Sequence, residues 1–345
     1  MLSSPPPTWL PEWAPQDAVM LTWPHAKTDW AAMLTDVQAT FVEIAKAINQ
    51  YQALLINCHT QHLLDNVRKQ LCHAELDMSR VDLLVIPNND SWARDHGPLS
   101  LTGGYLLNAQ FNGWGSKYSA SLDNDINQHV SDANHFLHPL TNTDFVLEGG
   151  SIESDGNGTV MTTTQCLLNP NRNAHLSRDE IESTVLELTQ HQRIIWLTHG
   201  HLAGDDTDSH IDTLARFMPN NTIVFQGCDD PNDEHFEALN AMKNELSQAL
   251  NADGKPYTTI ELPWPSVKTN AEGQRLPATY ANFLIINGAV LLPVYNDAQD
   301  QRAINLLAQV MPKHDIIPIR CTSLIQQFGS LHCVTMQLTQ GSLKR

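Results

Sequence analysis

Short apolar runs alternate with helical patterns along the whole chain, and this alternation limits the possible folds more than any other feature. The apolar runs that read as strands lie at residues 19–23, 81–87, 105–111, 144–150, 158–164, 193–199, 221–227, 281–295 and 332–338. Stretches with apolar residues at helical spacing lie between several of them, at residues 30–52, 179–191, 233–251 and 303–312. Repeated alternation of strands and helices predicts an α/β fold.

Two hairpin signals restrict the sheets further. Asn287-Gly288 lies between two apolar runs and favours a type I′ turn, and the segment SDGNG at residues 154–158 predicts a longer hairpin loop. Antiparallel pairs do not fit a purely parallel dinucleotide-binding sheet, and the chain also lacks GxGxxG and P-loop motifs. Apart from a proline-rich start and the loop at residues 261–277, no linker-like stretch divides the chain. We therefore expect one domain over residues 1–345, built from small β-rich units with helices outside.

Composition excludes several classes of protein. A 345-residue chain with 41% hydrophobic and 17% charged residues is expected to be globular. No apolar run approaches the roughly 20 residues that cross a bilayer, and the absence of a signal-peptide pattern predicts a cytoplasmic protein. The 38 acidic and 20 basic residues give a net charge of −18, which disfavours nucleic acid and anionic membranes as partners and favours a cationic ligand.

The chain has six cysteines at wide and irregular spacings. Without a CxxC pair or an export signal, we expect free thiols and not disulfides or a thiolate zinc site. Only Cys333 stands in a polar sequence. The others, Cys58, Cys72, Cys166, Cys228 and Cys321, are assigned to structural positions.

Four polar clusters lie where a predicted strand meets a loop: SWARDHGP (91–98), VLEGGS (146–151), GDDTDSHID (204–212) and SLHCVTM (330–336). In the third, an extended backbone would place His210 and Asp212 on one face, about 7 Å apart. A solvent-exposed strand end is one alternative for this cluster. A metal site formed by His199, His201 and His210 is another, although no second metal-binding pattern follows.

The first two clusters leave structural and functional roles open. Asp95 precedes a Gly-Pro turn, so it either caps that turn or serves a site. Trp92 is either part of the core or a flat wall for a planar cation. Glu148 ends an apolar run, where a buried charge must be paired. Both a structural ion pair and the orientation of a catalytic group satisfy that requirement.

Cys333 is the candidate nucleophile. In a strand over residues 332–338, Cys333 would share the more polar face with Thr335, while His332 would point to the opposite face. A buried core thiol is the alternative. Taken together, a thiol, a histidine and several carboxylates support nucleophilic catalysis with histidine as acid and base. Excess carboxylates suit a planar cation with several N–H donors, such as a guanidinium.

Six segments in one order extend this hypothesis to a family: PEWAPQDAVMLTWP, WARDHGP, LEGGSIESDGNGT, CLLNPNRN, DDTDSHIDTLARF and LHCVTMQ. Together they resemble the agmatine deiminases and bacterial peptidylarginine deiminases, which are guanidino-modifying enzymes. The resemblance implies the pentein fold, an α/β propeller of five ββαβ-type units around a pseudo-fivefold axis. The chain departs from the usual GGGNIHC approach to the cysteine, because Phe328 and Ser330 stand in QFGSLHC, and it carries His96 where threonine is common.

The resemblance also implies roles for individual residues. Cys333 is expected to be the nucleophile, His210 the general acid and base, and Asp95 and Asp212 the carboxylates that bind the guanidinium. Glu148 is expected to orient His210 or to share the guanidinium. Asp206 and Trp92 are expected to contact the substrate.

The implied reaction converts agmatine to N-carbamoylputrescine and ammonia through a covalent cysteine intermediate. It needs no metal and no organic cofactor, and its partner is a small cationic guanidinium substrate. Deimination of peptidyl-arginine or of another arginine derivative is the alternative. A metal-dependent hydrolase, a non-catalytic polyamine-binding protein and a homo-oligomer also remain compatible with the sequence.

Overall fold

The structure is a computed structural model that describes residues 5–344. Within these residues the strands form five small sheets. The first sheet has the order β16 (Met336–Thr339), β1 (Gln16–Thr22), β2 (Ala53–Cys58), β3 (Val81–Val85). The others are β4 (Leu99–Ser100), β5 (Leu106–Gln110), β6 (Thr141–Val146); β7 (Ile152–Ser154), β8 (Thr159–Thr163), β9 (Arg193–Leu197); β10 (Ala215–Met218), β11 (Thr222–Gln226), β12 (Thr258–Leu262); and β13 (Leu284–Ile286), β14 (Ala289–Val294), β15 (Asp315–Arg320).

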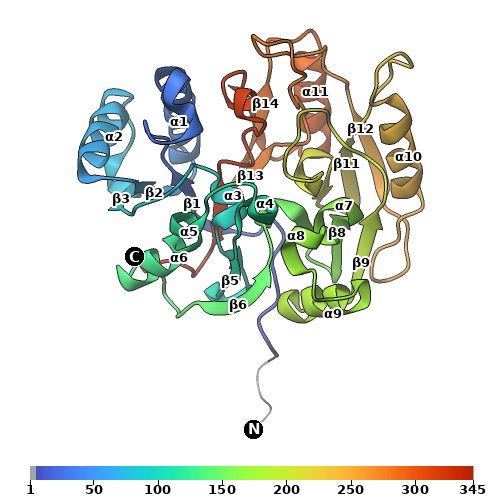
Figure 1. Cartoon of the computed structure of the whole chain (residues 1–345), viewed down its shortest axis with the longest axis horizontal. Coiled ribbons are helices and arrows are strands. Elements are labelled where there is room, and N and C mark those ends of the chain that lie inside the picture. The colour runs from blue at the N-terminus through green and yellow to red at the C-terminus, as the bar shows by residue number, and fades with distance from the viewer. Residues whose placement is uncertain (1–4, 345) are drawn as a thin grey trace.

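Each sheet repeats one pairing scheme. An antiparallel pair of strands comes first, and a parallel strand follows, as in β13–β14 and then β14–β15. In the first sheet the antiparallel partner of β1 is β16, so the end of the chain completes the sheet that its beginning starts. Every sheet is therefore mixed, and the prediction of an α/β fold that is not purely parallel is confirmed. In Figure 1 the sheets follow one another around the molecule in chain order.

Long helices and short helical turns take different places. The longer helices, α1, α2, α9, α10 and α11, lie toward the outside, and α3, α4, α7 and α8 lie nearer the centre (Figure 1). The α-helices are α1 (Leu34–Asn49), α2 (Gln61–His73), α3 (Ala93–His96), α4 (Gly113–Ser116), α5 (Ser121–Asn124), α6 (Ile126–Asp132), α7 (Thr164–Leu167), α8 (Pro170–Asn173), α9 (Arg178–Thr189), α10 (Phe236–Ser247) and α11 (Asp300–Val310). The 3₁₀ turns are η1 (Asp29–Met33), η2 (Met78–Arg80), η3 (Thr102–Gly104), η4 (Gly149–Ser151), η5 (Ile211–Thr213) and η6 (Leu324–Gln327).

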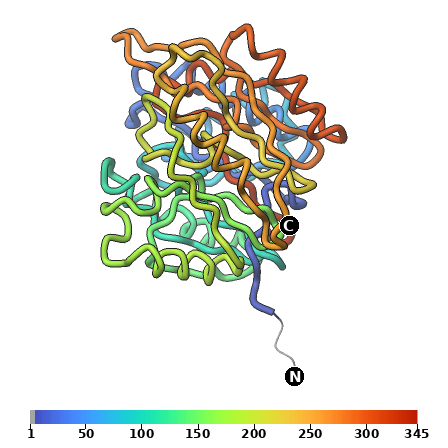
Figure 2. The backbone as a smooth tube through the Cα atoms, turned by 90° about the vertical axis from the view of Figure 1, so that its right-hand side faces the viewer, coloured from blue at the N-terminus to red at the C-terminus, as the bar shows by residue number. Residues whose placement is uncertain are grey.

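The helical periodicity of the sequence is reproduced in the packing. On α1, Val37, Phe41, Ile44 and Ile48 are fully buried, and they form one face of the helix. Figure 2 shows the described chain wound into a dense body. No helix within residues 5–344 combines the length and the apolar character that a membrane span requires.

The hairpin at residues 284–294 forms, but its turn differs from the prediction. A type I′ turn needs positive φ at both central residues. Of the Asn287-Gly288 pair only Gly288 has positive φ, at 75°. The Asn287 side chain instead binds β1, where its Oδ1 accepts from Gln16 N at 3.0 Å and its Nδ2 donates to Gln16 O at 2.8 Å. The type I′ prediction is therefore wrong, because a tertiary contact fixes Asn287.

Two segments predicted to be extended are turns. The strand expected over residues 332–338 begins only at Met336, and Thr335 Oγ1 donates to His332 O at 3.0 Å within the preceding turn. His210 and Asp212 likewise belong to the 3₁₀ turn η5 and its N-cap. Strand alternation therefore does not decide where the side chains of these two segments point.

Candidate active site

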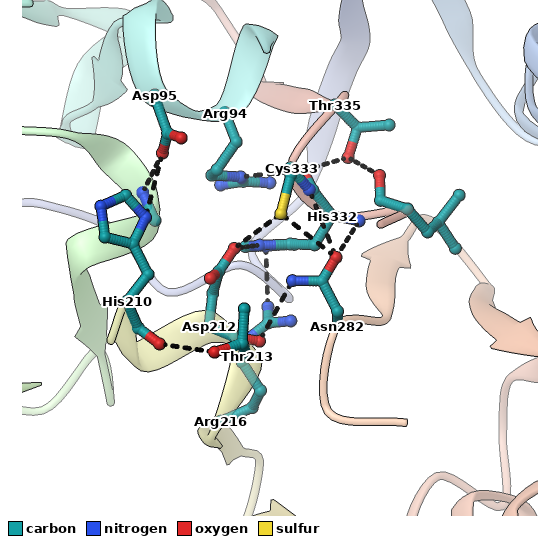
Figure 3. A network of polar contacts seen from close by, with 12 residues as sticks. Arg94, Asp95, His210, Asp212, Thr213, Arg216, Asn282, His332, Cys333 and Thr335 are labelled. Atoms are coloured by element: carbon teal, nitrogen blue, oxygen red, sulfur yellow. Dashed lines mark hydrogen bonds and ion pairs between the residues drawn. The ribbon is translucent and has the colours of Figure 1, made fainter. Parts of the chain in front are cut away.

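Four predicted site residues, Cys333 among them, come together from separate parts of the fold. Asp95 lies on α3, His210 and Asp212 lie at η5, and Cys333 lies in the turn before β16 (Figure 3). None of them is more than 5% exposed. Cys333 and Asp95 line a cavity of about 270 Å³. Packing has therefore brought a thiol, an imidazole and two carboxylates together, with Cys333 and Asp95 in the cavity lining and His210 and Asp212 behind it.

Asp95 is held by donors from two other segments. Its Oδ1 accepts from Gly150 N at 3.0 Å, and its Oδ2 accepts from Trp114 Nε1 at 2.9 Å. His210 Nδ1 lies 3.5 Å from Oδ1. Burial raises the pKa of Asp95 to about 6, and the charge of Asp212 acts in the same direction.

Gly150 marks the point where three of these side chains meet. A Cβ at this position would lie 2.8 Å from Asp95 Oδ1, 2.8 Å from His210 Nδ1 and 3.1 Å from Asp212 Oδ2. Only glycine allows the backbone to approach the cluster this closely. Gly150, the second glycine of VLEGGS, therefore belongs to the candidate site.

His210 is fixed through its backbone and stands in a negative environment. Its amide donates to Thr207 Oγ1 at 3.1 Å, and its carbonyl accepts from Thr213 Oγ1 at 2.9 Å. Burial alone would lower the pKa of His210, but Asp95, followed by Cys166, raises it well above its usual range. The protonated imidazole is thus favoured.

Cys166 was assigned to the core from the sequence, and it is fully buried on α7. Its sulfur also lies close to the site, because ligand atoms of Glu148, Cys166 and His210 lie within 4.8 Å of one another. Glu148 forms the ion pair that the sequence left open, since Arg172 Nε lies 2.9 Å from both of its carboxylate oxygens. Glu148 therefore stands behind His210, and it is not among the residues that line the cavity.

Asp212 and Cys333 share two neighbours that the sequence analysis did not assign to the site. Cys333 Sγ lies 3.4 Å from Asn282 Oδ1 and 3.9 Å from Asp212 Oδ2. Asp212 Oδ2 accepts from His332 Nδ1 at 2.7 Å. His332 was expected to point away from the site, and that expectation is wrong because the segment is a turn and not a strand.

The carboxyl group of Asp212 and the thiol of Cys333 have opposite pKa shifts. Burial alone would raise the pKa of Asp212, but the hydrogen bond and charge of His332 lower it. Burial, followed by the charges of Asp212 and Asp95, raises the pKa of the Cys333 thiol well above its usual range. Cys333 is therefore a thiol in the protein alone, and a cation beside the two aspartates would favour its thiolate.

The wall of the cavity is aromatic and acidic. Trp92 and Trp114 meet edge to face with ring centroids 6.4 Å apart, and a Cβ on Gly329 would lie 2.1 Å from the Trp92 ring. Asp206 Oδ2 accepts from Tyr118 Oη at 2.8 Å. Within the described chain, the acidic lining residues are Asp29, Asp90, Asp95, Asp123 and Asp206, and the basic one is Lys27. Such a wall favours a planar, cationic ligand.

The departures from the usual approach to the cysteine have different consequences. Phe328 has a φ of 64° and lines the cavity. Ser330 instead turns to Tyr295, with 3.0 Å between the two hydroxyl oxygens. His96 lies outside the cavity lining, with Nε2 3.2 Å from Thr22 Oγ1. Of the three, only Phe328 is positioned to contact a ligand.

The metal site proposed for His199, His201 and His210 is not supported. His199 is 55% exposed and pairs with Glu245, and these three histidines do not form a ligand group in the described chain. The acidic and histidine groups that do lie together are Glu148–Cys166–His210 and Glu12–Glu153–His332. In both, an arginine already binds the carboxylates. The metal interpretation of the three histidines is wrong.

The fold and the site define a class of protein, the hydrolases that act on carbon–nitrogen bonds of linear amidines. The chain belongs to the family of Porphyromonas-type peptidyl-arginine deiminases, whose family model matches residues 8–339. It is 32% identical over 352 residues to an agmatine deiminase of Pseudomonas syringae pv. tomato, covering 94% of each chain.

Solved structures of related deiminases also match this chain over nearly its whole length. A Porphyromonas gingivalis protein provisionally named an arginine deiminase is 45% identical, with a TM-score of 0.91 over 98% of this chain and 100% of that one. A Cys-to-Ser variant of C. jejuni agmatine deiminase with substrate bound is 36% identical, with a TM-score of 0.91 over 99% of both chains. The resemblance found in the sequence is confirmed.

Proposed function

We propose that this protein hydrolytically deiminates a guanidinium substrate, and that the substrate is agmatine. The observation that carries the proposal is the placement of Asp95 and Cys333 in the lining of an acidic cavity, with Asp212 Oδ2 3.9 Å from the Cys333 sulfur. Figure 3 shows these side chains together. Two carboxylates can hold a guanidinium by paired hydrogen bonds, and the thiol then faces its central carbon. The agmatine deiminases among the relatives support the same chemistry.

In the first step the guanidinium binds to Asp95 and Asp212, and Cys333 releases its proton to solvent in the cavity. Charge neutralisation of the two aspartates by the guanidinium favours the thiolate. The thiolate bonds to the central carbon, and protonated His210 gives its proton to one terminal nitrogen. The C–N bond breaks, ammonia leaves, and an S-alkylthiouronium remains on Cys333.

In the second step His210, now neutral, takes a proton from a water molecule, and the oxygen bonds to the central carbon. The C–S bond breaks, the Cys333 thiolate leaves, and the remaining hydroxyl proton passes to solvent. The product is a ureido compound, which for agmatine is N-carbamoylputrescine. Glu148 supports this cycle from behind His210, and Asp206 and Trp92 contact the substrate from the wall.

The acidic wall favours agmatine over arginine. The free end of agmatine is an ammonium, which the carboxylates attract, while the carboxylate of arginine would be repelled. Peptidyl-arginine is the second candidate, because the family model is named for peptidyl-arginine deiminases. A peptide has no cation at this end of the arginine, so the acidic wall gives it no comparable advantage.

We also infer that the five sheets are the five blades of a pentein propeller. Their common pairing scheme supports this arrangement, as does the way in which β16 and β1 join the two ends of the chain in one sheet. The whole chain would then be one domain around a central site.

Ammonia release from agmatine, arginine and a blocked arginine peptide tests the substrate. We expect agmatine to be converted most efficiently. Faster conversion of the peptide would establish the second candidate instead, and tight agmatine binding without ammonia release would identify a binding protein.

Cys333→Ala tests the covalent mechanism. We expect turnover to fall by roughly 10⁴-fold or more, as for other nucleophile deletions. The matched control is Cys72→Ala, because Cys72 is an exposed thiol and its loss should leave turnover unchanged. Mass spectrometry of wild-type protein quenched with agmatine should detect the amidino adduct on Cys333. Retained turnover in Cys333→Ala would disprove the mechanism.

A further inference from the structure

Glu12 of the PEW segment lies in the interior, although it precedes the first strand. It is 6% exposed, and its Oε1 accepts from Ile285 N at 2.7 Å. Its Oε2 lies 2.6 Å from His332 Nε2 and 2.8 Å from Arg216 Nη2. Glu12 does not line the cavity, so the proposed chemistry leaves its role unassigned.

His332 connects Glu12 to Asp212. Its Nδ1 lies 2.7 Å from Asp212 Oδ2, and its Nε2 faces Glu12. Burial alone would raise the pKa of Glu12, but Arg216 and His332 hold it far below its usual range. An ionised carboxylate can only accept a hydrogen bond. With both carboxylates ionised, contacts of this length need a hydrogen on each nitrogen of His332, which would then be an imidazolium clamped between Glu12 and Asp212.

The charges around this clamp balance when His332 is a cation. In that case three basic side chains, Arg94, Arg216 and His332, face three acidic ones, Glu12, Glu153 and Asp212. None of the six is more than 6% exposed. Buried charges persist when they are paired and hydrogen-bonded. Replacing Glu12 by a neutral residue would therefore remove the carboxylate that His332 Nε2 faces directly.

The neighbours of His332 Nε2 also allow a second hydrogen-bond pattern, in which this nitrogen accepts a hydrogen bond. Arg216 Nη2 lies 2.9 Å from His332 Nε2, as well as 2.8 Å from Glu12 Oε2. If Nε2 carried no hydrogen, it would accept from Arg216, and Glu12 would not act on His332. Glu12 can therefore act on Asp212 through His332 only if Nε2 carries a hydrogen.

We propose that Glu12 is a positioning residue for the deimination, which acts through His332 to keep Asp212 fixed as an acceptor for the substrate guanidinium. The inference rests on the proposed function of the site. The PEW segment thereby becomes a support of the active site, in addition to its place before β1.

Agmatine binding to Glu12→Gln tests the proposal without turnover, in a Cys333→Ala background. Glutamine keeps the shape of the side chain and removes its charge, so the imidazolium loses one partner. We expect the dissociation constant for agmatine to rise on the order of 10- to 100-fold, the effect of weakening one charge-assisted hydrogen bond. Glu12→Asp, which keeps the charge, should recover most of this affinity.

Glu153→Gln is the matched control. Glu153 pairs with Arg216 in the same network, but no hydrogen bond of the described residues joins it to His332. Its loss should lower the melting temperature and leave agmatine affinity unchanged. Equal affinity losses in Glu12→Gln and Glu153→Gln would overturn the proposal, because they would indicate a purely structural role.

Nitrogen NMR of histidine-labelled wild-type protein tests the clamp directly, and it needs no variant that could fail to fold. With His332 assigned through its neighbour Cys333, we expect hydrogen on both ring nitrogens at neutral pH. A bare Nε2 would overturn the proposal. Because this measurement does not depend on turnover, it separates a failure of the clamp from a failure of the proposed deimination.

Discussion

The surroundings of Asp95 show how the site changes the pKa of a single carboxylate. Burial raises its pKa to about 6, while the indole N–H of Trp114 and the amide of Gly150 stabilise the ionised form. In the proposed mechanism Asp95 must be ionised to bind the guanidinium, so we expect activity to decrease as the pH falls through about 6. The sequence predicted Asp95, but neither donor, because both come from segments that are distant in the chain.

Trp114→Phe should shift the loss of activity at acidic pH to a higher pH. The substitution removes a hydrogen bond to the ionised carboxylate, so the pKa of Asp95 rises and the acidic limb of kcat/KM moves to higher pH, by about one unit. The measurement is the pH profile of kcat/KM for agmatine. Trp30→Phe is the matched control, because the Trp30 indole donates to Ser91 Oγ at 2.9 Å and not to Asp95. An unchanged limb in Trp114→Phe would contradict this assignment.

At the scale of the elements, short turns and not long helices hold the site. The turn η5 carries Asp212, and α7 carries Cys166 beside it. Thr163 joins α7 to the segment that leads into η5, because its Oγ1 accepts from Cys166 N at 3.2 Å and donates to Ser209 O at 2.8 Å. Periodicity predicts long helices well, but such turns have too few residues to show a period.

Thr163→Ala and Thr60→Ala form a matched pair of threonine N-cap deletions. Thr60 caps α2, where its Oγ1 accepts from Leu63 N at 3.2 Å, and it does not line the cavity. Each variant should lose about 1 kcal/mol of stability, measured by urea unfolding. Only Thr163→Ala should also lower kcat, because it releases the segment that fixes His210. Equal kcat values in the two variants would show that this connection does not position His210.

At the scale of the whole molecule, Arg216 ties several sheets together. It lies on β10 and pairs with Glu153 on β7 and with Glu12 before β1. Its Nη1 also donates to Phe283 O at 2.5 Å, next to β13. Figure 3 shows Arg216 below Asp212, so this connection lies directly under the proposed site.

Arg216→Met should destabilise the protein strongly. The substitution leaves two buried carboxylates without their guanidinium, and breaking a buried pair costs roughly 3–5 kcal/mol. The control is Lys243→Met, whose exposed pair with Glu261 should contribute only about 0–1 kcal/mol. The free energy of urea unfolding checks both values. A small loss in Arg216→Met would show that the two carboxylates are protonated or hydrated without it.

The sequence by itself determined the class of fold and the chemistry. Alternating apolar runs, hairpin glycines and helical spacing reflect contacts between near neighbours, so they predicted mixed sheets with helices outside. The polar clusters around Cys333, His210, Asp95 and Asp212 predicted a thiol that acts on a guanidinium.

Only the tertiary structure decided how the side chains are oriented and paired. Strand alternation turned His332 away from the site, but residues 331–334 form a turn, and His332 bridges Asp212 and Glu12. The bond from His332 to Glu12 spans 320 positions of the chain. Contacts between residues this far apart in the chain arise when separate sheets pack together. A local sequence pattern does not indicate which side chains then meet.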